Sequence, residues 1–132
     1  MFWEPELGAC VMSKCILIAD DVEIIRHSVR DLFEAQPEFE VCAEAENGRE
    51  AIHKARHLHP DLIVLDLSMP VMSGLEAARI LRQIMPTVPI ILFTMFSGES
   101  TREAAESAGI AALVSKSEPA TTLVDKAKAL LN

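Results

Sequence analysis

Short apolar segments alternate with longer amphipathic segments along the chain. The apolar segments predict buried strands at residues 15–19, 39–45, 62–65, 88–93 and 111–114. Between them, apolar residues recur every three or four positions, which is typical of helices with one buried face. Five strand–helix pairs in strict alternation favour a parallel sheet with helices on both of its faces. The expected fold class is therefore α/β, with a doubly wound, five-stranded parallel sheet.

A length of 132 residues suits one compact domain. We assign residues 14–132 to this domain and residues 1–13 to an N-terminal extension, because Met12 stands just before the first predicted strand. The longest apolar segments, such as 88–93, fall far short of the roughly 20 residues that are needed to cross a bilayer. We expect no transmembrane helix.

Composition restricts the partners and the compartment. Acidic residues outnumber basic residues by 20 to 12, and the formal net charge is −8. Phosphate backbones are bound by basic surfaces, so direct nucleic-acid binding by this chain is not expected. The three cysteines, Cys10, Cys15 and Cys42, are too few and too irregularly spaced for a disulfide framework or a zinc cluster. They are predicted to be reduced thiols in a cytoplasmic protein.

Polar side chains follow four of the five predicted strands. Asp20 and Asp21 come after the first strand, Asp66 after the third, Thr94 after the fourth, and Lys116 after the fifth. The carboxyl ends of parallel strands meet at one edge of a sheet, where α/β proteins bind their ligands. Three carboxylates placed together repel one another, and a hard divalent cation relieves that repulsion. The sequence therefore predicts a Mg²⁺ site at this edge.

The hydroxyl of Thr94 and the ammonium of Lys116 suit the anionic oxygens of an incoming phosphoryl group. A carboxylate can accept phosphorus covalently as an acyl phosphate, with the cation and the lysine neutralising the charge on the oxygens. Asp66 lies on a central strand between the acidic pair and the Thr–Lys pair. We therefore predict Asp66 as the phosphoacceptor.

These residues carry a family resemblance. Asp66 opens the segment 66–74, which contains the pattern Met-Pro-x-Met-x-Gly. Together with the acidic pair, the threonine and the lysine at their spacings, this segment resembles a response-regulator receiver domain of two-component signalling. The resemblance covers about residues 14–131. It implies a flavodoxin-like fold, and a phosphoryl donor that is a sensor histidine kinase or a phosphotransfer protein.

The resemblance also implies roles for single residues. Asp20, Asp21, Asp66 and the backbone carbonyl of Ser68 would hold Mg²⁺, Thr94 would report phosphorylation, and Lys116 would supply the counter-charge. Phosphorylation would switch the surface made by the last two helices and the fifth strand, through which a homodimer could form. The domain would act as a switch and not as a metabolic enzyme.

Features of the NarL/FixJ type of receiver favour a role in transcription regulation. The segments 44–48, 92–95 and 113–117 are similar to that type, which usually precedes a DNA-binding domain. A stand-alone receiver, acting by protein–protein contact or as a phosphorelay shuttle, is the alternative. Receivers usually carry Tyr or Phe three residues before the lysine, whereas this chain has Leu113 and so lacks the aromatic side chain that usually takes part in the switch.

Other interpretations fit these residues less well. An aspartyl phosphatase or phosphotransferase would need a carboxylate where Ser68 stands, and an FMN carrier would need a glycine- and hydroxyl-rich loop after the first strand. A pseudo-receiver would have an incomplete acceptor site. Asp21 could simply cap the first helix. His53 and His57 have a spacing that can bind zinc, but a solvated helix face is favoured.

Overall fold

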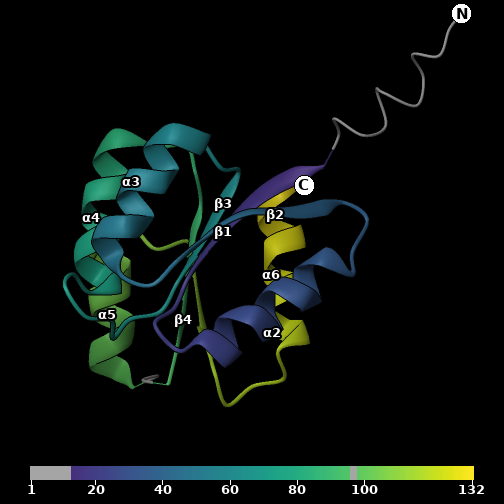
Figure 1. The fold of residues 1–132 in the computed structure, drawn as a ribbon. Coiled ribbons are helices and arrows are strands. Elements are labelled where there is room, and N and C mark those ends of the chain that lie inside the picture. The colour runs from purple at the N-terminus through teal and green to yellow at the C-terminus, as the bar shows by residue number, and fades with distance from the viewer. Residues whose placement is uncertain (1–12, 96–97) are drawn as a thin grey trace, which may run out of the picture.

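The computed structural model describes residues 13–95 and 98–132, which form a β-sheet with helices on both of its faces (Figure 1). The elements, in chain order, are β1 (Lys14–Ala19), α2 (Glu23–Glu34), β2 (Phe39–Ala45), α3 (Gly48–Leu58), β3 (Leu62–Leu65), α4 (Gly74–Ile84), β4 (Ile90–Thr94), α5 (Glu99–Ser107), β5 (Ala112–Ser115) and α6 (Thr121–Leu131). The strands are all parallel, in the order β2-β1-β3-β4-β5. The predicted flavodoxin-like fold class is confirmed. The predicted N-terminal extension falls almost entirely outside the described residues.

Two apolar cores lie on opposite faces of the sheet. Helices α3, α4 and α5 cover one face, and α2 and α6 cover the other (Figure 1). Neighbouring residues of a strand point to opposite faces, so Leu17 packs in the first core and Ile16 in the second. The middle strands are apolar at successive positions because both of their faces are covered.

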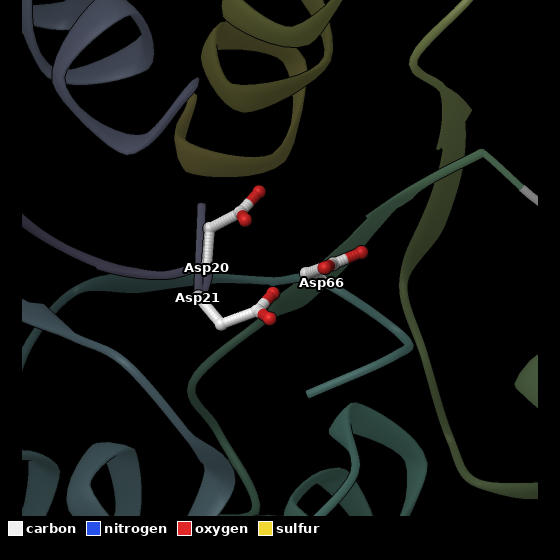
Figure 2. Close-up of side chains that lie close together, drawn as sticks. All are labelled: Asp20, Asp21 and Asp66. Carbon is white, nitrogen blue, oxygen red and sulfur yellow. The ribbon is translucent and has the colours of Figure 1, made fainter. Parts of the chain in front are cut away.

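The strand order reverses between β1 and β3, and this reversal positions the candidate site. Consecutive connections leave these two strands in opposite directions, which opens a crevice at their carboxyl ends. Asp20 and Asp21 follow β1, and Asp66 follows β3, so the three side chains meet at the same edge of the sheet (Figure 2).

A β-bulge interrupts the pairing of the edge strand β2 with β1. Ile16 pairs with Val41 and Leu17 pairs with Ala43, so Cys42 is an extra residue without a partner on β1. Val41 belongs to the core beneath α2 and α6, whereas Ala43 packs against the opposite core. The bulge therefore reverses the side-chain alternation of β2 and turns Glu44 toward α2.

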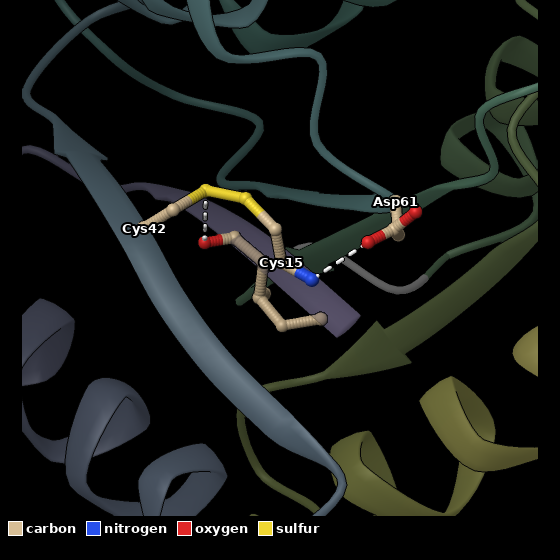
Figure 3. The surroundings of a disulfide bond; sticks show 4 residues. Cys15, Cys42 and Asp61 are labelled. Carbon is tan, nitrogen blue, oxygen red and sulfur yellow. Dashed lines mark hydrogen bonds between the residues drawn. A yellow bond between two sulfur atoms is a disulfide. The ribbon is translucent and has the colours of Figure 1, made fainter. Parts of the chain in front are cut away.

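Cys15 and Cys42 form a disulfide between β1 and β2 (Figure 3). The prediction of reduced thiols is thus wrong for these two residues, whereas Cys10 lies outside the described residues. The spacing of 27 residues gives no hint of this pairing. The two cysteines meet because β1 and β2 are neighbours and both side chains point away from the core that holds Ile16 and Val41, with the Cα atoms 5.5 Å apart.

The turn between β3 and α4 is closed by tight backbone packing at Gly74. The N–H of Gly74 donates to the Leu67 carbonyl over 2.9 Å, and Ser73 and Glu76 form a capping box that begins α4. A Cβ atom at position 74 would collide with the backbone carbonyl of Asp66. Glycine is therefore required here by the close approach of two backbone segments and not by its φ angle.

None of the helices within residues 13–95 and 98–132 is long and apolar enough to span a membrane, as the sequence predicted.

We expect Gly74→Ala to lower the free energy of unfolding by about 1–3 kcal/mol, because the added methyl group meets a backbone that has no room to move. The matched control is Gly98→Ala, since an added Cβ there meets nothing within 4 Å. Urea unfolding followed by circular dichroism measures both changes. Equal losses in the two variants would contradict the packing argument.

Candidate functional site

Three carboxylates form the centre of the site (Figure 2). Asp20, Asp21 and Asp66 each offer one oxygen, and these oxygens all lie within 4.8 Å of one another. Asp20 and Asp66 are buried, with exposed fractions of 3% and 7%, whereas Asp21 faces solvent. Oxygen ligands at this spacing, one of them open to water, fit a Mg²⁺ ion that keeps part of its hydration shell.

Lys116 is the basic partner of the two buried carboxylates. Its Nζ atom lies 2.7 Å from Oδ2 of Asp20 and 3.4 Å from Oδ1 of Asp66. The backbone N–H of Lys116 donates to the Thr94 carbonyl over 2.8 Å, so the ends of β4 and β5 are fixed to each other. Thr94 itself is fully buried. One ammonium therefore bridges two carboxylates at a place where a phosphoryl group would also need positive charge.

Ser68 lies in the loop after β3 and is exposed. The predicted role of its backbone carbonyl as a metal ligand stays a prediction. The other predicted site residues, Asp20, Asp21, Asp66, Thr94 and Lys116, lie together at the carboxyl edge of the sheet.

The surroundings of Asp66 change the pKa of its carboxyl group. Burial raises the pKa of the Asp66 carboxyl, and the charge of Asp20 raises it further, while Lys116 acts in the opposite direction and only partly compensates. The net effect is a pKa above the usual range of aspartate. In the absence of a cation, the ionised form of Asp66 is thus disfavoured by its surroundings.

The backbone N–H, the backbone carbonyl and both carboxylate oxygens of Asp20 all form hydrogen bonds. Its N–H donates to the Ala45 carbonyl over 3.0 Å, and its Oδ1 accepts the Val22 N–H over 2.9 Å. Its Oδ2 accepts from Lys116, and its carbonyl accepts from Nη1 of Arg26 over 2.8 Å. Val22 is the N-cap residue of α2 and has no side-chain cap, so the alternative role of Asp21 as a helix cap is not observed.

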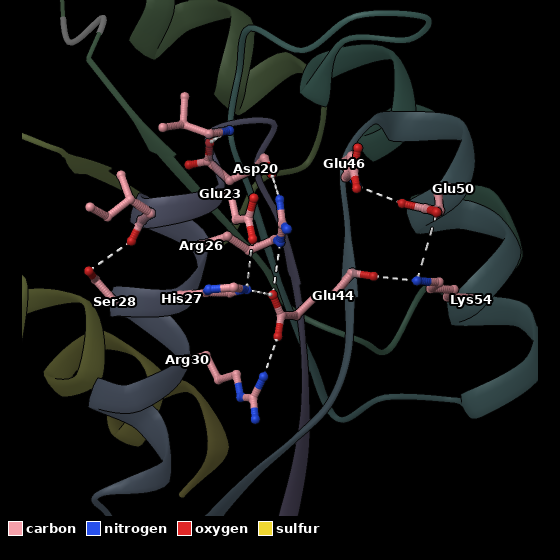
Figure 4. A network of polar contacts seen from close by, with 12 residues as sticks. Asp20, Glu23, Arg26, His27, Ser28, Arg30, Glu44, Glu46, Glu50 and Lys54 are labelled. Atoms are coloured by element: carbon pink, nitrogen blue, oxygen red, sulfur yellow. Dashed lines mark hydrogen bonds and ion pairs between the residues drawn. The ribbon is translucent and has the colours of Figure 1, made fainter.

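Arg26 and Glu44 belong to the site but were not predicted from the sequence (Figure 4). Nε of Arg26 donates to Oε1 of Glu44 over 2.8 Å, and Nη1 of Arg30 donates to Oε2 over 2.9 Å. Burial alone would raise the pKa of Glu44, but the hydrogen bonds from the two arginines outweigh it and hold that pKa below its usual range. Arg26 is only 7% exposed. Its buried guanidinium therefore forms hydrogen bonds with the Glu44 carboxylate and the Asp20 carbonyl in place of water.

A signal for Arg26 was present in the sequence. It stands between Val22 and Val29 at helical spacing, on the face predicted to be apolar, where a charge requires a partner. The identity of that partner depends on the bulge in β2, which no local pattern reveals.

The histidines do not form a metal site within the part of the chain that the structure describes. His53 and His57 are exposed on α3, and their rings contact each other with centroids 4.5 Å apart. Among residues 13–95 and 98–132, only the three aspartates make a group of three or more side chains that could hold a metal ion.

Comparison with known proteins identifies the family. Residues 16–128 match the model of the response regulator receiver domain, so the chain belongs to that family. Its acidic triad is typical of the Mg²⁺ site of receiver domains.

Solved structures show the same fold. A two-component response regulator of the LuxR family from Aurantimonas sp. SI85-9A1 is 36% identical with a TM-score of 0.86, over 90% of this chain and 85% of that chain. A DNA-binding response regulator of the LuxR family from Staphylococcus aureus is 27% identical with a TM-score of 0.85, over 90% and 99% of the two chains.

Curated relatives carry the same kind of domain within longer proteins. The protein-glutamate methylesterase/protein-glutamine glutaminase 1 of Methanosarcina acetivorans is 38% identical over 74% of this chain and 28% of its own length. The transcriptional regulatory protein LnrK of Bacillus subtilis is 33% identical over 83% of this chain and 50% of its own length. The chain thus spans half or less of these two relatives.

We expect Arg26→Gln to lower the free energy of unfolding by about 2–4 kcal/mol, because it weakens a buried ion pair and the bond to the Asp20 carbonyl. Arg30→Gln is the matched control, since Arg30 contacts the same carboxylate from a half-exposed position and its loss costs far less. Chemical denaturation measures both. A larger loss for Arg30→Gln would contradict the central place given to Arg26.

The raised pKa of Asp66 predicts that the free energy of unfolding depends on pH. Its raised pKa means that the folded chain keeps this proton to a higher pH than the unfolded chain does, so its contribution to stability falls as the pH rises through that interval. Asp66→Asn removes the effect. In metal-free buffer, the stability of the variant relative to wild type should therefore increase as the pH rises above about 4, the usual pKa of an aspartate in an unfolded chain. Unfolding curves measured at a series of pH values test this prediction. A difference in stability between the variant and wild type that does not change with pH would contradict it.

Proposed function

We propose that this receiver takes a phosphoryl group from the phosphohistidine of a sensor histidine kinase, or of a phosphotransfer protein, onto Asp66. The observation that carries the proposal is the position of the Asp66 carboxylate, which shares Lys116 with Asp20 and lies within the acidic triad. Receiver domains generally act with histidine kinases, and family membership supports the same class of partner here.

The residues suit in-line phosphoryl transfer. An Asp66 oxygen forms a bond to phosphorus as the bond from phosphorus to the donor nitrogen breaks, and the product is an acyl phosphate. Lys116 contacts the Asp66 carboxylate and would also stabilise the negative charge that develops on the phosphoryl oxygens. Asp20, Asp21 and Asp66 would hold Mg²⁺, together with the Ser68 carbonyl, and the bound ion would neutralise further oxygen charge.

The chain acts in this proposal as a switch and not as a metabolic enzyme. A phosphatase or phosphotransferase with an aspartyl intermediate would need a second carboxylate two residues beyond Asp66, and Ser68 occupies that position. We also propose that the reaction takes place in the cytoplasm. Movement of Thr94 toward the phosphoryl group would change the surface of α5, β5 and α6, even with Leu113 in the position of the usual aromatic residue.

We further propose that the output is transcription regulation, with a homodimer forming through the surface of α5, β5 and α6. The likeness to LuxR-family regulators and to LnrK supports this assignment. With a net charge of −8, the chain would not contact DNA itself. A stand-alone receiver that works by protein–protein contact or as a phosphorelay shuttle is the alternative, and it requires no dimer on activation.

We expect wild-type protein with Mg²⁺ to incorporate phosphate from a small phosphodonor such as acetyl phosphate, and Asp66→Asn to incorporate none. Intact-mass spectrometry measures the gain. Chelation of the cation should abolish it, whereas equal labelling of the variant would refute the assignment of Asp66. Light scattering on the activated protein separates the two outputs, because only the transcription-linked form is expected to dimerise.

A further inference from the structure

The Cys15–Cys42 disulfide lies on the face covered by α3, away from the acidic triad, but β2 connects the two. Cys42 is the extra residue of the bulge. Two residues further on, Glu44 holds Arg26, and Ala45 accepts the N–H of Asp20. Since Arg26 also donates to the Asp20 carbonyl, the carboxyl half of β2 fixes the backbone of Asp20 at both its N–H and its carbonyl.

Cys42 is a partly buried residue at the surface of the molecule. Cys42 lines two neighbouring surface grooves, one with His53 and His57 of α3 and the other with Arg30 and Glu44. Lys54 lines both grooves. A cation beside a disulfide attracts an incoming thiolate, and it also stabilises the thiolate that forms when the disulfide opens.

The fold also has a place for the reduced side chains. Sγ of Cys42 lies 3.6 Å from the Ile16 carbonyl, which can accept the weak hydrogen bond of a free thiol (Figure 3). The N–H of Cys15 donates to Oδ2 of Asp61 over 2.7 Å, and this bond does not involve sulfur. Backbone pairing between β1 and β2 continues on both sides of the bulge. Reduction can thus occur without unfolding the sheet.

We propose that Cys15 and Cys42 are a reversible thiol–disulfide site for small thiols, and that its state sets how firmly β2 holds Asp20. In the reductive direction, the thiolate of a small thiol attacks Sγ of Cys42, and Cys15 leaves as a thiolate that takes a proton from water. A second thiolate then attacks the mixed disulfide and releases Cys42, which also takes a proton. Two cysteine thiols are formed, and two small thiols are oxidised to one disulfide.

The consequence for the acidic site rests on the proposed function. With the disulfide closed, the bulge is tied to β1, and Glu44 and Ala45 are held in register with Ile18 and Ala19. Opening it lets the edge strand move, which loosens both bonds to the Asp20 backbone. The oxidised chain should therefore bind Mg²⁺ more tightly than the reduced chain, by about threefold to tenfold.

The first test follows the thiols of the full chain in glutathione buffers of graded redox ratio. After alkylation, peptide mass spectrometry separates Cys15 and Cys42 from Cys10. We expect a bridged peptide that is lost and regained reversibly while circular dichroism stays native. Lys54→Gln should slow reduction by about threefold, and its exposed neighbour Arg56, which lines neither groove, provides the control Arg56→Gln. A pair that never bridges, or that opens only in denaturant, would overturn the proposal.

The second test is calorimetric titration of Mg²⁺ into the oxidised and the reduced chain. Cys42→Ser should match the reduced chain and should not respond to a reductant. Equal, measurable affinities in the two redox states of wild type would overturn the redox coupling and leave the proposed function intact. If neither state binds Mg²⁺, the proposed function fails, and the coupling fails with it.

Discussion

The repulsion among three carboxylates at one edge of the sheet is the constraint on which the rest of this structure depends. Asp20 and Asp66 are buried together, and Lys116 is shared between them at 2.7 and 3.4 Å. One ammonium cannot compensate three carboxylates, and burial together with the charge of Asp20 raises the pKa of Asp66. A site of this kind gains from any added positive charge, and an acyl phosphate on Asp66 would draw on the same lysine and cation.

The backbone around Asp20 keeps this unfavourable arrangement in place. Its N–H and carbonyl are bound by Ala45 and Arg26, and Arg26 is itself held by Glu44. These contacts come from α2 and from β2, and β2 lies on the far side of β1 from the strand that carries Asp66. The edge strand therefore has a second role beyond completing the sheet, because the bulge at Cys42 determines which residues of β2 can reach the acidic site.

Much of the fold and most of the site could be predicted from the sequence, because the signals are local. Four of the five apolar strands are followed by a polar residue of the site, and parallel strands bring those ends together, so the sequence alone assigns Asp20, Asp66 and Lys116 to one site. The disulfide and the Arg26–Glu44 pair were missed because both depend on the register of β1 with β2. A single extra residue changes that register, and neither periodicity nor spacing records it.

Titration of Mn²⁺ into metal-free protein, followed by electron paramagnetic resonance, tests the central claim most directly. Asp21 is the variant to compare, since it is exposed and its replacement leaves the buried pair with Lys116 untouched. If the three carboxylates form one cation site, wild type binds a single ion that Mg²⁺ displaces, and Asp21→Asn binds it far more weakly. Binding of the same strength in the variant, or no binding to wild type at millimolar concentrations, would contradict the account.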